Sequence, residues 1–253
     1  MTIRMTRYFT VPYDSGHKGL RMGAGPFRLA QELGVDAEEI EPASPFRREI
    51  TTAFELYRAL ATRVRESNDF PVVLSGNCGS AIGTAAGIGT ERLAILWFDA
   101  HGDYNTPDTT DSGFLDGMCL AVLTGRCFHN LAKTIPHFAP VSPSRTIQVG
   151  SRNYSPGERE ALEADGVRMT PAFDGIDADR ILVHVDLDVI DPQFGRANPY
   201  AVGGGLSPDD VLHVIEEARA HFEIAGLVLA SYDPSCDEDG RIAAVGARIV
   251  RAI

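Results

Sequence analysis

Short apolar segments alternate with longer segments of helical periodicity along most of this 253-residue chain. Five of the apolar segments have the character of buried strands, because they are rich in Val, Ile and Leu and are bounded by polar or glycine residues. Buried strands that alternate with helices predict an α/β fold, in which a mostly parallel sheet is covered by helices on both faces. The predicted strands are 71–76, 93–103, 145–150, 181–192 and 224–234.

Helical patterns fill much of the space between these strands, at 80–88, 156–166, 207–222 and 240–252. The third of them opens with Ser207, Pro208 and two aspartates, which suit a helix N-terminus. Gly166 is placed to end the second. Segment 34–50 gives no clear prediction. No linker, repeat or low-complexity tract interrupts the chain, so we expect one domain over residues 1–253.

The composition of the chain limits the kinds of partner that the protein is expected to bind. The formal net charge is −12, which argues against a nucleic-acid partner because no basic surface is expected. No apolar run approaches the length of a membrane span, and residues 1–10 lack the apolar core of a secretory signal. The four cysteines form no C-x-x-C pair. We therefore expect a cytoplasmic protein that binds a small molecule.

Polar clusters follow four of the predicted strands, with the sequences SGNC, DAHGD, DLD and SYDP. Ligands of open α/β sheets bind beyond the carboxyl ends of the strands, so these clusters predict a single site there. The spacing of Asp99, His101 and Asp103 places them on one face if the strand continues through them. Asp186 and Asp188 repeat this spacing on a second strand.

Four carboxylates in one poorly hydrated place require positive charge nearby. Divalent metal ions supply it, and carboxylates with one imidazole suit Mn, Mg or Fe better than a thiolate-rich zinc site does. A pair of such ions also ionises water near neutral pH. The alternative is that these acids simply cap helices at the ends of loops.

The motifs DAHGDYNTP and VDLDVIDP resemble the two central metal motifs of the arginase (ureohydrolase) family. The resemblance extends from YDSGHKGLRMGAGP to SYDPSCDEDGR. It implies a three-layer α/β/α fold, two manganese ions and a homo-oligomer, either a dimer, a trimer or a hexamer. By position, Asp99 and Asp186 resemble the family's bridging carboxylates. Asp103 would bind one metal only, and His101 and Asp188 the other.

The segment SGNCGSAIG departs from the family pattern, because Cys78 stands where the family has a histidine ligand. The hydrolases of N-hydroxyarginine resemble this chain in having a cysteine there. A thiolate is a soft ligand that suits manganese poorly, so we expect this metal position to be weak or to take another divalent ion. Alternatively, Cys78 is a small buried residue and the ion is lost.

Three other positions bear on the chemistry. His184 lies two residues before Asp186 and is expected to support a carboxylate from behind the metals. The alternatives are a side chain that is simply packed and hydrogen-bonded, and a direct metal ligand. Asp116 takes the place of the family's proton-shuttling histidine, and an acid can also move protons. Ser231 stands where the family has a glutamate that grips the guanidinium group, which weakens the case for unmodified arginine.

The amino-acid end of the substrate has its own matches. Asn105, Thr110 and Ser112 match the residues that hold the substrate α-carboxylate in arginases. Glu158 is kept, whereas Asn153 and Ser155 replace acids near the α-amino group. All of these are also good turn formers. Their joint match favours a substrate that resembles an amino acid.

The sequence as a whole predicts a manganese-dependent amidinohydrolase that cleaves a C–N bond in a substrate of the arginine or N-hydroxyarginine type. Asp103 and Asp116 are the candidate catalytic acids. A formimino-amino-acid hydrolase of the same family is the first alternative. A catalytically weak metal-binding or regulatory homologue is the second.

Overall fold

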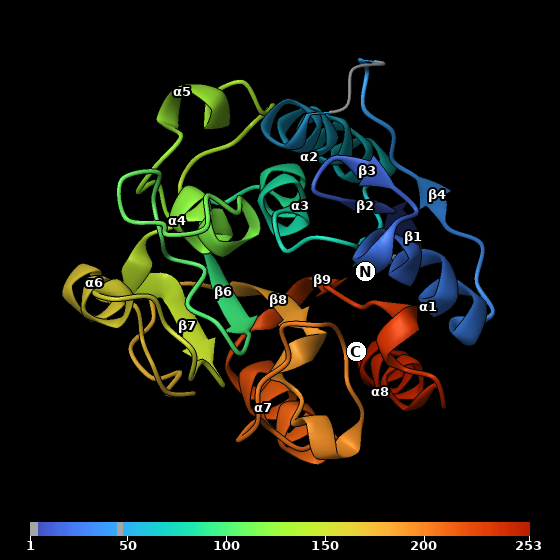
Figure 1. The fold of residues 1–253 in the computed structure, drawn as a ribbon. Helices are drawn as coiled ribbons and strands as arrows, with labels where there is room; N and C mark the ends of the chain where they lie inside the picture. Colours follow the sequence, from blue (N-terminus) through green and yellow to red (C-terminus); the bar gives the residue numbers. More distant parts are fainter. Residues whose placement is uncertain (1–4, 45–47) are drawn as a thin grey trace.

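A parallel β-sheet runs through the middle of the molecule, with helices on both faces (Figure 1). The structure is a computed structural model that describes residues 5–44 and 48–253. The sheet is formed by β1 (Thr6–Val11), β4 (Glu38–Glu39), β5 (Phe70–Ser75), β6 (Leu93–Phe98), β7 (Thr146–Val149), β8 (Arg180–Asp186) and β9 (Glu223–Ala230). Within the described residues these seven strands pair in the order β4-β1-β5-β9-β8-β6-β7, all in parallel.

Side chains of the central strands alternate between two hydrophobic layers. On β6, Trp97 faces one layer and Phe98 faces the other, and Leu182 and Val183 divide in the same way on β8. Both faces of these strands are therefore buried, which explains why their sequences are almost continuously apolar.

Each face of the sheet is covered by helices that come from separate parts of the sequence. α2 (Glu49–Ser67), α3 (Ser80–Ile88) and α4 (Cys119–Leu123) pack on the face that includes Trp97, whereas α1 (Gly25–Leu33), α7 (Pro208–His221) and α8 (Arg241–Ala252) pack on the other (Figure 1). The short α5 (His129–Ala132) and α6 (Glu158–Asp165) add Ala132 and Leu162 to the layer that includes Trp97, and β2 (Tyr13–Asp14) and β3 (His17–Lys18) form a separate antiparallel pair. The predicted three-layer α/β/α fold is confirmed.

Local signals at the helix ends were good predictors. α3 has the predicted bounds, and α7 begins with a capping box in which the Ser207 hydroxyl accepts from the Asp210 backbone N–H at 3.1 Å. α6 begins at Glu158, later than predicted, because Gly157 has a φ of 78°. Gly166 ends it in the left-handed region, as expected.

Several predicted strands are too long. The strands of 93–103, 181–192 and 224–234 end at Phe98, Asp186 and Ala230, where the chain turns out of the sheet. The elements from β1 to α2 had no prediction. Residues 1–4 of the N-terminal segment and residues 45–47 of the unassigned segment 34–50 lie outside the described residues.

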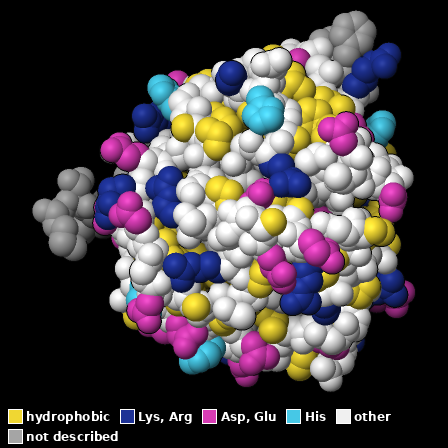
Figure 2. Space-filling model, turned by 90° about the vertical axis from the view of Figure 1, so that its left-hand side faces the viewer, with side chains coloured by type: hydrophobic (Ala, Val, Ile, Leu, Met, Phe, Trp, Pro, Cys, Tyr) yellow, Lys and Arg dark blue, Asp and Glu magenta, His cyan; other side chains and the backbone are white. Residues whose placement is uncertain are grey.

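The excess negative charge is dispersed over the face drawn in Figure 2, where acidic, basic and apolar side chains intermingle. Among the described residues, no helix is both long enough and apolar enough to cross a membrane.

Candidate metal and substrate site

A cavity of about 220 Å³ opens where the carboxyl ends of β5, β6, β8 and β9 meet the loop after β7. Parallel strands end at the same edge, so residues far apart in sequence converge there. Asp99 and His184 are buried outside the cavity wall. The other predicted site residues all line the cavity: Cys78, His101, Asp103, Asn105, Thr110, Ser112, Asp116, Asn153, Ser155, Glu158, Asp186, Asp188 and Ser231.

The segment that follows β6 is a turned loop and not a strand. The Asp99 Oδ1 accepts a hydrogen bond from the His101 backbone N–H at 2.8 Å, and its Oδ2 accepts from the Trp97 indole at 3.2 Å. Asp103 has a φ of 52°, in the left-handed region. The expected alternation of these residues on an extended strand is therefore wrong. The loop instead directs His101 and Asp103 to the cavity wall and leaves Asp99 beneath it.

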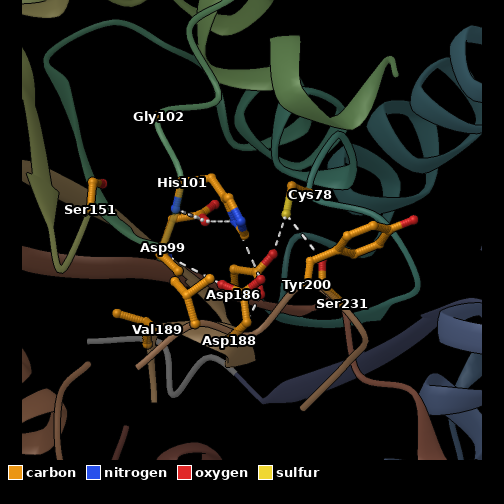
Figure 3. Close-up of polar contacts among 12 residues, drawn as sticks. Cys78, Asp99, His101, Gly102, Ser151, Asp186, Asp188, Val189, Tyr200 and Ser231 are labelled. Carbon is orange, nitrogen blue, oxygen red and sulfur yellow. Dashed lines mark hydrogen bonds and ion pairs between the residues drawn. The ribbon is translucent and has the colours of Figure 1, made fainter. Parts of the chain in front are cut away.

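The second pair of aspartates also lies where a strand ends. Asp186 is the last residue of β8, and its Oδ1 accepts from the Asp188 backbone N–H at 2.8 Å. Asp188 is in a 3-10 turn, η4 (Leu187–Val189), so the two do not share a strand as predicted. The His101 Nδ1 lies 3.3 Å from the Asp99 Oδ1 and 3.4 Å from the Asp188 Oδ2 (Figure 3). The imidazole thus links the two polar segments.

The electrostatics of the site favour cations. Burial, reinforced by neighbouring negative charge, raises the pKa of Asp99, Asp103 and Asp186. Burial also works against charge on His101, yet its side-chain hydrogen bonds with Asp188 and Asp99 raise its pKa to about 11. The Asp103 Oδ2 has no hydrogen-bond partner among the described residues. Divalent ions would replace protons on these oxygens and satisfy them.

Cys78 lies in the turn before α3, against the carboxylates (Figure 3). Its thiol donates to the Asp186 Oδ2 at 3.0 Å, and its sulfur lies 3.2 Å from the Ser231 Oγ. Burial raises the pKa of Cys78, and the charge of Asp186 adds to this. An ion that binds here must therefore displace the thiol proton.

Among the residues that the structure describes, two groups of three donors are compact enough to hold an ion. Asp99, His101 and Asp188 form one group, and Cys78, Asp99 and His184 form the other, with the donor atoms of each group within 4.8 Å of one another. Donors that bind one ion tetrahedrally at 2.0–2.3 Å lie roughly 3.3–3.8 Å apart, so a modest closure of each group would bring its donors to one ion. The donor set therefore fits two divalent ions that share Asp99.

Asp116 begins the 3-10 turn η2 (Asp116–Met118) on another wall of the cavity. Its carboxylate accepts from the Asn77 amide at 2.7 Å, the Gly79 backbone N–H at 3.3 Å and the Cys119 thiol at 3.3 Å. Burial outweighs these hydrogen bonds and raises the pKa of Asp116 to about 6. A carboxyl with this pKa exchanges protons readily near neutral pH.

Amide and hydroxyl groups form the opposite end of the cavity. The Asn105 amide donates to the Ser155 Oγ at 3.1 Å. Glu158 accepts from the backbone N–H groups of Tyr104 and Ser155, both at 2.9 Å, and so fixes the two loops that carry Asn105 and Ser155. Thr110 and Ser112 lie at the rim, with their hydroxyls 3.5 Å apart, and Asn153 pairs with the backbone of His101.

His184 lies beneath the cavity, stacked on Trp97 with ring centroids 3.7 Å apart. Its side chain is fully buried, and burial lowers its pKa to about 3. The expected hydrogen bond to a carboxylate is not among the contacts of the described residues, since neither ring nitrogen has a partner there.

The sequence analysis missed Asn198 and Tyr200, which are among the residues that line the cavity. The Asn198 amide donates to the Asp188 Oδ2 at 3.3 Å and to the Ser231 carbonyl at 2.8 Å, and so joins two strand ends. Tyr200 packs near Phe114, with ring centroids 5.9 Å apart. Both missed residues lie in an irregular loop with no periodicity, so only the tertiary fold reveals their position.

The arginase family model matches residues 9–253. This chain belongs to the arginase family. One curated relative, the N(omega)-hydroxy-L-arginine amidinohydrolase of Streptomyces lavendulae, is 32% identical over 192 residues, which cover 72% of this chain and 67% of the relative. The arginase of Bacillus caldovelox is 27% identical over 286 residues, which cover 96% of this chain and 95% of that arginase.

Solved structures agree with this assignment. The structure of Bacillus caldovelox arginase matches with a TM-score of 0.86 at 25% identity, over 99% of this chain and 98% of that chain. The formimidoylglutamase of Bacillus subtilis has the same fold, with a TM-score of 0.77 at 20% identity, over 100% of this chain and 86% of the other. The resemblance to arginase-family hydrolases drawn from the motifs is confirmed.

Proposed function

We propose that this arginase-family protein hydrolyses the amidino or guanidino C–N bond of an amino acid of the arginine or N-hydroxyarginine type. One observation carries the proposal: a single cavity joins the donor set for two ions to the amide and hydroxyl groups of Asn105 and Ser155. The first part suits hydrolysis, and the second suits a polar amino-acid end. Similarity to the Streptomyces lavendulae enzyme supports the choice of substrate.

Each part of the cavity has a separate task in this reaction. Divalent ions held by the two donor groups would supply hydroxide near neutral pH and would stabilise negative charge in the transition state. The Asp116 carboxylate takes up the proton that the attacking water loses and then gives it to the departing amine as the C–N bond breaks, so that the OH of water ends on the urea-type product and its H on the amine. The Asp103 carboxylate places negative charge close to the reacting carbon of the substrate. Asn105 and Ser155 orient the amino-acid end, and Ser231 leaves room for a substituted guanidine.

The same proposal extends to the identity of one metal ion, the extent of the catalytic unit, the location of the protein and its assembly. We infer that manganese fills the carboxylate-rich position formed by Asp99, His101 and Asp188, since hard oxygen donors suit it. From the family resemblance we also propose one catalytic unit over residues 1–253, a cytoplasmic location and assembly as a homo-oligomer. Light scattering of the purified protein measures its assembly, and fractionation of the cells that make it tests its location.

A substrate panel tests the activity directly. Arginine, N-hydroxyarginine, agmatine and formiminoglutamate are each offered to the protein with excess Mn²⁺, and the released amine is measured. We expect turnover of an α-amino acid guanidine and little turnover of agmatine, which lacks the carboxylate. Asp186→Asn is the inactive control. A preference for agmatine would contradict the proposal.

A formimino-amino-acid hydrolase is the second candidate. Ser231 motivates it, because this residue presents no charge to a guanidinium group and its hydroxyl is already 3.2 Å from the Cys78 sulfur. Turnover of formiminoglutamate alone would establish this candidate. Tight metal binding without turnover of any of the four compounds would instead favour a binding or regulatory homologue.

A further inference from the structure

The imidazole of His184 packs by its face against Trp97, but its two nitrogens have no structural role among the described residues. It projects from β8 towards α3, it is fully buried, and neither ring nitrogen has a hydrogen-bond partner among the described residues. A buried polar atom without a partner destabilises a protein by about 1–3 kcal/mol. Such groups are rare in native structures and call for an explanation, such as an ion.

The surroundings of His184 contain two donors from other elements. A ring nitrogen of His184, the Cys78 sulfur and an Asp99 carboxylate oxygen lie within 4.8 Å of one another. The pairing of β6 with β8 sets His184 opposite Trp97, one layer below Asp99 and Asp186. The stacked indole leaves the edge of the imidazole free to face the thiol and the carboxylate.

We propose that Cys78, His184 and Asp99 form a nitrogen–sulfur–oxygen site that selects a zinc-class ion, Zn²⁺ or Co²⁺, beside a manganese ion at the carboxylate-rich position. The inference rests on the two-ion centre of the proposed function and specifies one half of it. Thiolate and imidazole donors favour zinc and cobalt over manganese. Three protein donors also leave a fourth position open, as in catalytic zinc sites.

Charge and geometry are consistent with this site. The thiol proton that Cys78 now donates to Asp186 passes to solvent when the ion binds, and the resulting thiolate is the ligand. Distances of about 2.0 Å to nitrogen and 2.3 Å to sulfur require only a modest closure of the three donor atoms. His184 thereby gains the partner that it lacks.

Cobalt reports directly on a sulfur ligand. Full-length protein stripped of metal with a chelator is titrated with Co²⁺, and its absorption spectrum is recorded. We expect a thiolate-to-cobalt charge-transfer band in the near ultraviolet and visible bands of low-coordinate cobalt. Cys78→Ser removes the charge-transfer band. Cys119→Ser, a change at another fully buried cysteine outside the three-donor group, keeps the band and is the matched control.

Substitution of His184 and of His101 should affect the binding of different ions. His184→Asn weakens Zn²⁺ binding about 10–100-fold in calorimetry, as expected for the loss of a ligand or its direct support, and leaves Mn²⁺ binding at the other position. His101→Asn has the opposite effect: it weakens Mn²⁺ binding and retains the cobalt–thiolate band. Circular dichroism shows whether each variant is folded.

X-ray absorption on the wild type needs no variant. With one equivalent of Zn²⁺, we expect one sulfur at about 2.3 Å and imidazole scattering from a nitrogen at about 2.0 Å. Zinc bound only by oxygen, or a His184→Asn protein with unchanged zinc affinity, would overturn the inference. Hydrolysis in the substrate panel would still uphold the proposed function in that case. A cobalt–thiolate site in a protein that turns over none of the four compounds would support the inference and contradict the proposed function.

Discussion

At the scale of single residues, Asp116 is the group whose environment is best suited to proton transfer. It is buried in the cavity wall, three donors hold its carboxylate, and its pKa is raised to about 6. Asp116→Asn keeps the shape but cannot release a proton. We expect kcat to fall about 10²–10⁴-fold with little change in KM.

Steady-state kinetics with the preferred substrate of the panel measures this effect. Asp111→Asn is the matched control, because Asp111 is exposed in the same loop and does not line the cavity. An Asp116→Asn enzyme that retains wild-type kcat would exclude Asp116 as the proton donor.

We expect Asn105 to contribute to substrate affinity and not to the chemical step. Its amide donates to the Ser155 hydroxyl and its carbonyl accepts from Thr109 at 3.2 Å, which fixes it at the end of the cavity away from the proposed metal ligands. Contacts with a remote carboxylate bind substrate and transition state alike. Asn105→Ala should therefore raise KM about tenfold and change kcat little. Ser112→Ala should act in the same direction.

The comparison with Asp108→Asn, an exposed position in the same loop, separates a binding effect from loop disturbance. If Asn105→Ala lowers kcat and leaves KM unchanged, then Asn105 acts in the chemical step and the assigned substrate orientation is wrong.

Strand burial located the residues that closely follow a strand, such as Asp186 and Ser231, whereas Thr110, Ser112 and Asp116 were located by the resemblance to the arginase family. The local geometry was not predictable from spacing. Asp103 reaches the cavity through a left-handed backbone conformation, and Asp188 does so through a 3-10 turn. Asn198 and Tyr200 come from an irregular loop and could be placed only by the tertiary fold.

At the scale of secondary-structure elements, prediction succeeded where both faces of a strand are buried and where helix caps are explicit. It failed in the N-terminal part. β4 has only two residues, both glutamates, and its strand character depends on pairing with β1. α2 has a mixed sequence whose helical face becomes clear only against α3.

Helix α1 is joined closely to the loop after β9, which carries Ser231. The backbone of Gly25 has an ordinary helical conformation, but an added Cβ would overlap the Tyr232 carbonyl oxygen. Gly25→Ala should therefore destabilise the protein by about 1–3 kcal/mol, since neither backbone can move away easily. Thermal unfolding measures this.

Gly203→Ala is the matched control for that change, because a Cβ there meets no atom within 4 Å. Equal melting temperatures for the two variants would show that the contact between α1 and this loop adjusts without penalty.

At the scale of the whole molecule, the strand order places residues from positions 78 to 231 around one cluster of buried acids. The order β5-β9-β8-β6 is not encoded in any local pattern, so the sequence predicted convergence at the sheet edge but not which strands are neighbours. Because the cluster joins four strand ends, ions bound there should stabilise the entire fold.

Metal removal should make stability depend on pH. Without metal, the folded-state pKa values of Asp103 and Asp186 are raised by burial. Their contribution to the free energy of unfolding is fully present below their unfolded pKa, near 3.8, and is lost as pH rises through the raised folded values. The melting temperature of the metal-free protein should therefore fall as pH rises above about 4, and pH 6 and pH 8 are two points at which to compare it.

Bound ions neutralise the same acids, so the metal-loaded protein should change far less over this range. At an ion concentration 100 times Kd, binding adds about 2.7 kcal/mol, or roughly 5–10 °C in Tm for a chain of this size. Scanning calorimetry with Mn²⁺ and with chelator, at both pH values, measures the difference. Asp186→Asn removes one buried charge and should reduce both the pH dependence without metal and the response to Mn²⁺. If the gap in Tm between metal-loaded and metal-free protein is the same at pH 6 and pH 8, these acids do not control the stability of the fold.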